Sequence, residues 1–260
     1  MTGQRSTFVS AKRPSFGAWC VIPGGFTAQL LAHAGFDWLC IDMQHGPIGY
    51  TEMRAMVQAV RFTGVPVAVR VSTNAGGEIM RALDVGADGV IVPMVNSAAE
   101  AEAAVAACRY PPLGARSWGP SGASIGREFT IEAANRDVAC LVMIETSEGV
   151  ANAEEIAAVQ GLDGIYVGPN DLGISLGLQP LLIDHGPVLT EAIGKVAQAC
   201  RRHGVVAGVA IYEPDAAAAV AKWQALGFTF FGLPADSLLL RRAAEALLAS
   251  LAEHRPEADA

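Results

Sequence analysis

Short apolar runs alternate with helix-period segments along most of the chain. The apolar runs predict eight strands, at Phe16–Ile22, Phe36–Asp42, Pro66–Val71, Gly89–Val95, Ala139–Glu145, Gly164–Gly168, Val205–Ile211 and Phe228–Leu233. The helical segments are Thr27–Ala34, Thr51–Phe62, Gly77–Val85, Ala98–Cys108, Ile131–Asn135, Glu148–Val159, Pro187–His203, Asp215–Leu226 and Ser237–Ala252. Eight strands, each followed by a helix, are typical of a (β/α)₈ TIM barrel of about 250 residues. A doubly wound open sheet is the rival fold, but it usually has fewer strands and no closing pair.

One strand–helix–strand unit, from Cys140 to Asp171, carries the clearest chemical signal. Its first apolar run ends on Glu145, and Asp171 follows the second run. Because the unit implies parallel neighbouring strands, both carboxylates are expected past their carboxyl ends, where α/β barrels place ligands. Two carboxylates without Cys or His beside them suit a hard divalent cation. The alternative is that both acids cap the helices that follow them.

The segment from Arg109 to Asp137 breaks the alternation, because it is long and irregular. Connections of this length are usually lids or interface segments. We find no internal linker or repeat beyond the strand–helix period, so we expect one barrel domain over residues 1–260. Residues 1–14 are expected to be a flexible leader and residues 254–260 a flexible tail.

Composition excludes several classes of protein. Hydrophobic residues make up 52% of the 260 residues, charged residues 17%, and the net charge is −8, which does not suit a nucleic-acid partner. No apolar run reaches the roughly 20 residues that a membrane helix needs, and the polar N-terminus lacks a signal-peptide core. Five scattered cysteines, with no CxxC pair, read as buried reduced thiols in a cytoplasmic protein: Cys20, Cys40, Cys108, Cys140 and Cys200.

The positions of the lysines and the sequences of the last strand ends restrict the possible reaction mechanisms and cofactors. Of the three lysines, Lys12 precedes the first strand, whereas Lys195 and Lys222 fall inside predicted helices. None ends a strand, so a Schiff-base mechanism is excluded. The ends of the last two strands, VAIYEP and GLPADS, lack the glycine-rich loop typical of a phosphate site, and no GxGxxG opens a helix, so no nucleotide cofactor is indicated.

Polar residues gather at the predicted strand ends: Asp42 and His45 after the second strand, Arg70 at the third, and then Glu145 and Asp171. A barrel brings such ends together at one mouth. An acid pair, a cation and a candidate base suit an oxyacid substrate chelated by a metal.

Each of these residues also has a structural interpretation. His45 lies in a Gly-Pro turn and could be an ordinary polar loop residue, and Asp42 could hold that turn through an Asx bond. Arg70 follows an apolar run, so a structural ion pair inside the barrel is an alternative to substrate binding. Asp84, inside a helix, looks structural on its own, and Arg116 is expected to be solvated or at an interface.

The segments FDWLCIDMQHGP, VAVRV, RALDVGADGVIVPMV, RYPPLGARSWG, VMIETSEGVAN and DGIYVGPNDLGISLG resemble the HpcH/HpaI aldolase/citrate lyase family, the metal-dependent pyruvate aldolases. The match runs in order from about Gly17 to Leu248. It implies a (β/α)₈ barrel whose last helix is often exchanged between subunits, commonly in a hexamer built as a trimer of dimers. It also implies a divalent metal, Mg²⁺, Mn²⁺ or Co²⁺, held by Glu145 and Asp171. The backbone amides of Asn170 and Asp171 match those that bind the pyruvate carboxylate.

The same resemblance assigns the remaining roles. Arg70 matches the arginine that contacts the bound keto acid, and His45 matches the catalytic histidine. Asp84 matches the acid that partners this histidine, and Asp42 matches an acid near it. The partners are therefore expected to be a small keto acid and an aldehyde.

Two positions depart from the family pattern. Gln44 stands before the histidine, where many members have glutamate, and Met143 stands two residues before the metal glutamate, where many have glutamine. Met143 removes a polar contact beside the keto acid, so hydroxypyruvate becomes a possible donor as well as pyruvate.

These observations lead to the hypothesis of a reversible aldol reaction: Arg70 stabilises the enolate of the donor and His45 transfers the proton of the hydroxyl group, directly or through water. Two rivals remain. An acyl-CoA carbon–carbon lyase of the citrate-lyase type would need a basic patch for the nucleotide, and the sequence shows none near the mouth. A non-catalytic keto-acid-binding barrel would not need His45.

Overall fold

The described residues form a closed barrel of eight parallel strands, β1 (Ser15–Cys20), β2 (Trp38–Asp42), β3 (Val67–Arg70), β4 (Gly89–Val92), β5 (Ala139–Ile144), β6 (Gly164–Val167), β7 (Val206–Ala210) and β8 (Phe230–Leu233). The structure is a computed structural model, and it describes residues 9, 12–126, 128–179 and 186–254. Each strand pairs with the next, and β8 pairs with β1 to close the sheet. The predicted (β/α)₈ fold is confirmed. The proposed leader and tail lie largely outside the described residues.

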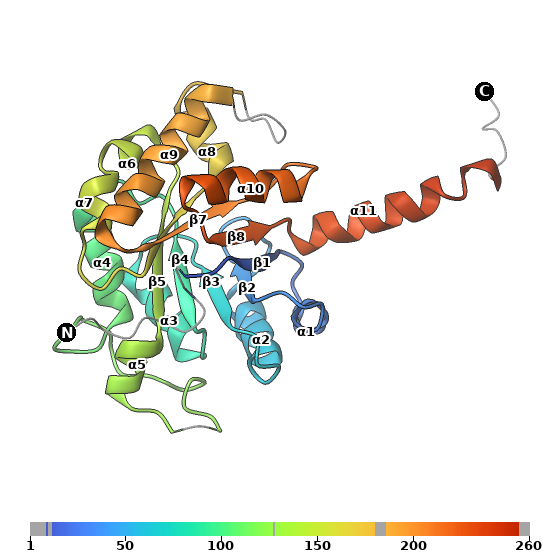
Figure 1. Cartoon of the computed structure of the whole chain (residues 1–260). Helices are drawn as coiled ribbons and strands as arrows, with labels where there is room; N and C mark the ends of the chain where they lie inside the picture. The colour runs from blue at the N-terminus through green and yellow to red at the C-terminus, as the bar shows by residue number, and fades with distance from the viewer. Residues whose placement is uncertain (1–8, 10–11, 127, 180–185, 255–260) are drawn as a thin grey trace.

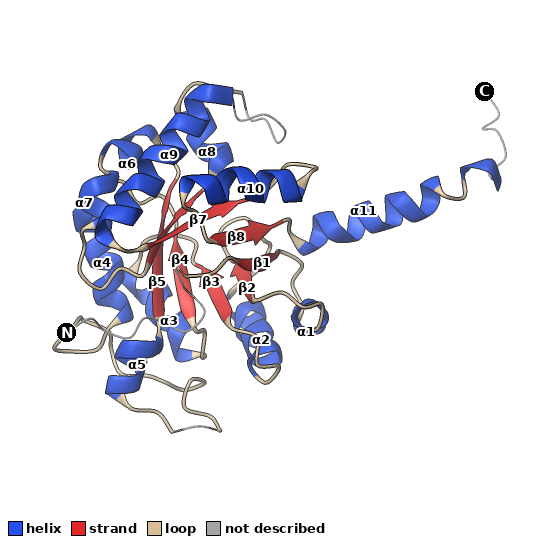
Figure 2. Cartoon of the chain, viewed as in Figure 1, coloured by secondary structure: helices blue, strands red, loops and turns tan. Residues whose placement is uncertain are grey.

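Helices surround the barrel (Figure 2). They are α1 (Gly25–Ala32), α2 (Tyr50–Arg61), α3 (Gly76–Asp84), α4 (Ala98–Cys108), α5 (Ile131–Asp137), α6 (Ser147–Ala151), α7 (Ala153–Ala157), α8 (Pro169–Ser175), α9 (Gly186–His203), α10 (Ala216–Leu226) and α11 (Asp236–Ala249), with a final 3₁₀ turn at Ala252–His254. The helix expected at Glu148–Val159 is interrupted at Asn152, whose side-chain amide donates to the Asn96 carbonyl at 2.7 Å. The short helix α8 was not predicted.

The two-residue period of the strands decides which side chains face the barrel interior. In β2, Leu39 and Ile41 pack outward against the helices, whereas Trp38 and Cys40 join the interior cluster. Continuing the alternation turns Asp42 inward at the carboxyl end of the strand. The same rule applied to β5 turns Met143 inward, and Glu145 one step beyond it. The hydrophobic alternation therefore determines which polar groups reach the mouth.

Aromatic rings close the barrel below the mouth. Trp38 and Phe230 stack with ring centroids 4.0 Å apart, and Trp19 meets Tyr166 edge-on at 5.6 Å. Glycine makes room for them: a Cβ atom on Gly232 would lie 1.9 Å from the Tyr166 hydroxyl oxygen. The interior is thus a packed core, and a pocket opens at the carboxyl ends of its strands.

The last helix, α11, does not cover the barrel of its own chain. It extends away from the other helices (Figure 1), and Leu240 and Leu247 are each 64% exposed. None of the described helices is both long and apolar enough to cross a membrane.

The long connection after α4 lies against the C-terminal end of α3. The amides of Gly122 and Ala123 donate to the Asp84 carbonyl at 2.7 and 2.9 Å, and Arg61 donates to the carbonyls of Gly122, Ala123 and Ile125. Since each helix runs back from the mouth to the other end of the barrel, this segment lies away from the strand carboxyl ends. It does not act as a lid on the mouth of its own chain.

Candidate active site

A pocket of about 330 Å³ opens at the carboxyl ends of the strands. Its lining contains seven residues expected from the sequence, Asp42, His45, Arg70, Met143, Glu145, Asn170 and Asp171. The remaining lining residues are Trp19, Val21, Tyr166, Gly168, Pro169, Ala210, Tyr212 and Ala235. The barrel thus gathers groups from strands that are far apart in the sequence.

Arg70 and Asp42 form a buried ion pair on neighbouring strands. Arg70 Nε donates to Asp42 Oδ1 at 2.8 Å, and Nη2 donates to Oδ2. The strand register places the two residues directly opposite each other. Burial lowers the pKa of Arg70, but the bonds to Asp42 and its negative charge outweigh burial and raise the pKa overall. The structural ion pair considered for Arg70 is therefore real, and the guanidinium stays charged.

The ion pair leaves one edge of the Arg70 guanidinium for a ligand. Its plane lies over the Trp19 ring at 4.7 Å, and Nη1 approaches the Met143 sulfur at 3.8 Å. A thioether is a weak acceptor, so Nη1 keeps most of its capacity to donate. Three neighbours orient the guanidinium in the pocket, which is consistent with binding an oxyanion.

Asp42 also shapes the turn that carries His45. Its Oδ1 accepts hydrogen bonds from the amides of Gln44 at 3.0 Å and His45 at 3.3 Å. This is the Asx turn considered from the sequence, and it coexists with the ion pair to Arg70. No hydrogen bond to the His45 imidazole is found within the described part of the chain. The exposed His45 side chain lines the rim of the pocket.

Glu145 is the deepest carboxylate of the pocket, only 1% exposed. Its Oε1 accepts from the Met94 amide at 2.8 Å, while Oε2 has no hydrogen-bond partner among the described residues. Burial raises the pKa of Glu145, and the charge of Asp171 raises it further, whereas the Met94 amide and Arg70 lower it. Glu145 does not cap the following helix, since Thr146 does so. Met94 holds a left-handed backbone, φ 56°, a strained conformation that places its amide toward the carboxylate.

Asp171 lies inside the first turn of α8 and does not cap the helix, since the N-cap is Gly168 and no side-chain cap hydrogen bond forms among the described residues. Pro169 occupies the first helical position and has no N–H group, which leaves the amides of Asn170 and Asp171 as early donors without an intrahelical partner. The side-chain oxygen of Asn170 is buried and unpartnered. This end of the pocket therefore offers both donors and acceptors to a ligand.

The donor set fits a hard divalent cation. Among the described residues, no group of three or more His, Cys, Asp or Glu is arranged to hold a metal. Asp171 lies near enough for its charge to raise the pKa of Glu145, and the free Oε2 of Glu145 gives the pair an unsatisfied anionic oxygen. Protein oxygens on one side, completed by water and substrate oxygens, suit Mg²⁺ or Mn²⁺, which keep several such ligands.

Two charged residues considered from the sequence lie outside the pocket of this chain. Asp84 does not line the pocket, because it ends α3 and forms an ion pair with Arg116 at 2.9 Å. Arg116, expected to be solvated or at an interface, is instead only 2% exposed and lies over the Tyr110 ring at 4.6 Å. Long-range pairing between α3 and the irregular connection explains both, and neither residue's sequence neighbourhood reveals it. The assignment of Asp84 as the partner of His45 is not met inside one chain.

Some lining residues were missed from the sequence. Trp19, Tyr166 and Tyr212 belong to strands β1, β6 and the end of β7, which carry no charge pattern. The signal was available in the alternation: Tyr212 stands two residues after Ala210 and Trp19 two residues after Gly17, so each faces inward. Gly168 was also overlooked, although a Cβ there would lie 2.7 Å from Glu145 Oε2.

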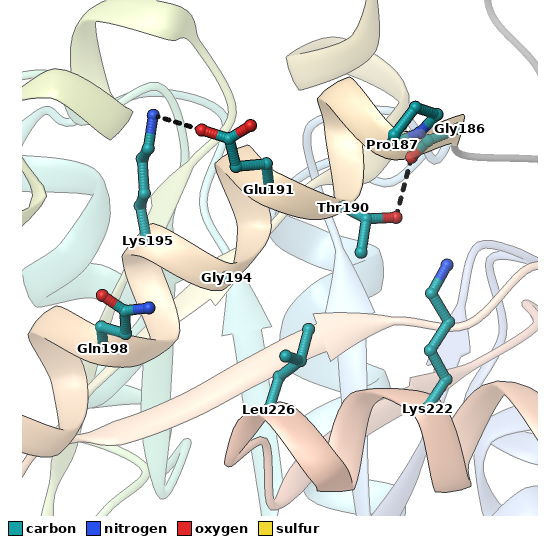
Figure 3. Close-up of a pocket in the computed structure, with 9 residues that line it drawn as sticks. All are labelled: Gly186, Pro187, Thr190, Glu191, Gly194, Lys195, Gln198, Lys222 and Leu226. Atoms are coloured by element: carbon teal, nitrogen blue, oxygen red, sulfur yellow. Dashed lines mark hydrogen bonds and ion pairs between the residues drawn. The ribbon is translucent and has the colours of Figure 1, made fainter.

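A larger groove of about 750 Å³ lies on the outside of the barrel between α9 and α10 (Figure 3). Lys195 pairs there with Glu191 at 3.1 Å, and the Thr190 hydroxyl donates to the Gly186 carbonyl at 2.8 Å. Lys222, from α10, lines the same groove. Since Lys195 and Lys222 lie on outer helices, neither reaches the strand ends, as predicted.

Comparisons with known proteins agree with this geometry. A family model described as HpcH/HpaI aldolase/citrate lyase matches residues 24–237. The chain is 37% identical to the hydroxypyruvate/pyruvate aldolase of Rhizorhabdus wittichii, over 91% of this chain and 94% of that protein. It is also 37% identical to the 4-hydroxy-2-oxo-heptane-1,7-dioate aldolase of Escherichia coli, over 93% and 92%. A crystal structure of an HpcH/HpaI aldolase/citrate lyase family protein from Burkholderia cenocepacia superimposes with a TM-score of 0.85 at 30% identity, over 94% and 96% of the chains.

Proposed function

The chain belongs to the HpcH/HpaI aldolase/citrate lyase family, and we propose that it catalyses the reversible aldol addition of pyruvate or hydroxypyruvate to an aldehyde, giving a 4-hydroxy-2-oxo acid. The relatives named above are aldolases, one of them for pyruvate and hydroxypyruvate. The observation that carries the proposal is the buried Glu145 carboxylate, whose unpartnered Oε2 opens into a pocket shared with Asp171 and Arg70.

Glu145 and Asp171 are the proposed ligands of a divalent cation, Mg²⁺, Mn²⁺ or Co²⁺. When bound, such a cation supplies Lewis-acid polarisation of the donor's keto and carboxylate oxygens. The protein's own contribution is to hold the pair in place: Met94 fixes Oε1 of Glu145, and the first turn of α8 fixes Asp171. Lysine takes no part in this mechanism.

Arg70 and the start of α8 are proposed to hold the keto acid. The amides of Asn170 and Asp171 donate to its carboxylate, as helix N-termini do for anions. Arg70 Nη1 donates to the keto oxygen, where negative charge grows as the adjacent carbon loses its proton. Because Asp42 and Trp19 orient the guanidinium in advance, little reorganisation is needed at that moment. Met143, 2% exposed, makes the adjoining wall apolar.

His45 is proposed to move the proton of the hydroxyl group. In the addition direction, the donor carbon gives its proton to solvent water and bonds to the aldehyde carbon as the C=O π bond of the aldehyde breaks. The aldehyde oxygen takes a proton from His45, or from a water that His45 positions, and solvent restores that proton. In the cleavage direction, His45 or its water removes the hydroxyl proton, the carbon–carbon bond breaks as the aldehyde C=O bond forms, and the donor carbon takes a proton from solvent water. The rim position of His45 places it opposite Glu145 and Asp171, where the aldehyde oxygen is expected.

The direct test is product formation. Incubation with a divalent cation, either pyruvate or hydroxypyruvate, and glycolaldehyde should give a 4-hydroxy-2-oxo acid, identified by NMR spectroscopy and mass spectrometry. Addition by one donor and not the other would define the effect of Met143. Consumption of neither donor, with any of several aldehydes, would contradict the proposal.

Replacing Gly168 by alanine should weaken metal binding about 10–100-fold, the range for residues that position metal ligands. The new Cβ would lie 2.7 Å from Glu145 Oε2 and 3.2 Å from the Met143 methyl carbon, so the carboxylate has to move. Gly173→Ala on the same helix is the matched control, since its nearest neighbour, Leu189 Cδ2, lies at 3.7 Å. Calorimetric titration with Mn²⁺ measures the effect. Equal affinities for the two variants would show that Glu145 is not a ligand.

A homo-oligomer, a hexamer built as a trimer of dimers, is part of the proposal. Its support is α11, which extends from the barrel with exposed leucines. Exchange of this helix with a second copy would bury them, at about 1.5–3 kcal/mol for each side chain.

The variant Leu240→Glu/Leu247→Glu should therefore lower the molar mass in solution to that of the monomer. Size-exclusion chromatography with light scattering measures it, with the surface variant Arg241→Gln/Glu245→Gln as control, which removes only an exposed pair at 3.8 Å. An unchanged mass in the leucine variant would refute the exchange.

The proposal also includes a single barrel domain and a reducing compartment. One barrel domain is supported by the closed sheet, which uses strands from Ser15 to Leu233. A reducing compartment such as the cytoplasm is supported by the five cysteines, all free and buried.

A further inference from the structure

The mouth of the barrel has two sides that differ in charge. The strand order places the ends of β3, β4, β5 and β6 along one arc, which carries Arg70, Glu145 and Asp171. The ends of β7, β8, β1 and β2 complete the circle along the other arc. If the keto acid occupies the first arc, the aldehyde must approach from the second. The residues of the second arc therefore face the part of the aldehyde that does not react.

The second arc offers no free cation. Its rim residues in the pocket are Val21, His45, Tyr212 and Ala235. Arg70 is the only lysine or arginine among the described lining residues, and it is committed to Asp42 and the donor. A carboxylate, sulfonate or phosphate on the aldehyde would lose water here without gaining a partner, which is costly.

One buried charge beside this arc is negative. Asp236, 4% exposed, accepts hydrogen bonds from the amides of Val21 at 3.0 Å, Ile22 at 3.2 Å and Ser237 at 2.8 Å. Three backbone donors satisfy its carboxylate, so Asp236 holds the loop after β1 and the start of α11 together. Asp236 therefore offers no hydrogen-bond donor or positive charge to an anion in the neighbouring space.

Besides His45, which the proposed reaction uses for proton transfer, Tyr212 is the polar side chain among these rim residues. Its amide donates to Glu213 Oε2 at 3.0 Å, and Glu213 Oε1 accepts from Trp223 Nε1 at 3.3 Å, which ties the turn to α10. The Tyr212 hydroxyl has no hydrogen-bond partner among the described residues. Burial raises the pKa of the phenol; Arg70 lowers it, and the carboxylates of the pocket raise it, so the hydroxyl remains a neutral donor and acceptor.

We propose that the acceptor is an uncharged hydroxyaldehyde and that Tyr212 selects it by a hydrogen bond to the hydroxyl group of the aldehyde. This inference rests on the proposed aldolase function and names its second substrate class. The apolar neighbours Val21 and Ala235 accept the carbon chain, while the phenol recognises its oxygen. Tyr212 is thus a specificity-determining residue of the acceptor site.

The first test compares acceptors in the presence of metal and pyruvate. We expect the wild-type protein to use glyceraldehyde with a higher kcat/KM than propanal, and butanal with a higher kcat/KM than the anionic 4-oxobutanoate. In Tyr212→Phe the glyceraldehyde-to-propanal ratio should fall about tenfold, the value of one hydrogen bond. An unchanged ratio, or a preference of the wild-type protein for 4-oxobutanoate, would overturn the inference.

A gain-of-function pair tests the charge argument separately. Ala235→Lys should raise kcat/KM for 4-oxobutanoate about tenfold relative to Ala235→Met, a variant of similar length without the charge. Equal values for the two variants would mean that the acceptor does not lie along this arc.

The inference and the proposed function fail in different ways. Metal-dependent exchange of the pyruvate methyl protons needs no aldehyde and reports donor activation alone. Exchange accompanied by a preference for the anionic aldehyde overturns only the acceptor assignment. Absence of exchange with both donors overturns the aldolase function, and the acceptor assignment with it.

Discussion

Replacing Glu145 by alanine should abolish metal binding and aldol turnover together. The loss of rate should exceed the ~10²–10⁴-fold that is typical of removing a general acid or base, because a ligand and not a proton carrier is lost. The carboxylate is only 1% exposed, and its single hydrogen-bond donor, the Met94 amide, would be left without an acceptor. Titration calorimetry with Mn²⁺ and initial-rate measurements test both losses.

The matched control for this experiment is Glu148→Ala. Glu148 lies three residues further along, exposed in the first turn of α6, and does not line the pocket. It removes the same charge from the same region, so nonspecific electrostatic effects appear in both variants. Normal turnover by Glu145→Ala would remove Glu145 from the metal site.

Replacing His45 by alanine should lower kcat for aldol addition and cleavage by about 10²–10⁴-fold while the protein still binds metal and keto acid. The imidazole lines the rim, and its hydrogen-bond connection to Asp42 runs through the backbone amide, which alanine retains. Metal affinity and pyruvate binding are measured by calorimetry, and kcat by the rate of product formation.

His33→Ala is the control for the His45 variant. His33 is an exposed histidine at the end of α1 and does not line the pocket. If His45→Ala lost keto-acid binding to the same extent as turnover, His45 would act in donor binding and not in proton transfer. Full activity of His45→Ala would exclude it from the reaction.

The barrel and most of the mouth followed from the sequence because both depend on local periodicity. A strand of known direction fixes which residues face inward, and Asp42, Arg70 and Glu145 each fall on an inward position at a carboxyl end. Closure of the sheet then brings them together without any further information. The resemblance to a known family indicated the roles of these residues, whereas their positions at the mouth followed from the strand pattern alone.

What the sequence did not reveal depends on contacts between distant segments. The burial of Arg116 requires Asp84 and Tyr110 as neighbours, and neither lies beside it in the chain. The left-handed backbone of Met94 is a conformation that methionine rarely adopts, so no propensity predicts it. The short helix α8 begins with Pro169 and contains Gly173, so its intrinsic helix propensity is low. Contacts with α9 stabilise it instead.

The position of Asp84 within one chain does not explain the role that the family resemblance assigns to it. Its carboxylate is engaged by Arg116 at the end of α3, away from the strand carboxyl ends that carry His45. If Asp84 partners the His45 imidazole, it must therefore do so in the pocket of another copy of the chain. The charge pattern around Asp84 gives no sign of either environment.

The central claim is that this pocket activates a keto acid in a metal-dependent way. The measurement that tests it most directly is hydrogen–deuterium exchange at the methyl group of pyruvate, followed by proton NMR in deuterium oxide. It is performed with the chelated protein and again after Mg²⁺ is restored, with hydroxypyruvate as the second donor. We predict exchange only when the metal is present, and none for Glu145→Ala under either condition. No exchange with either donor in the metal-loaded wild-type protein would contradict the account and favour an acyl-CoA lyase or a keto-acid-binding barrel.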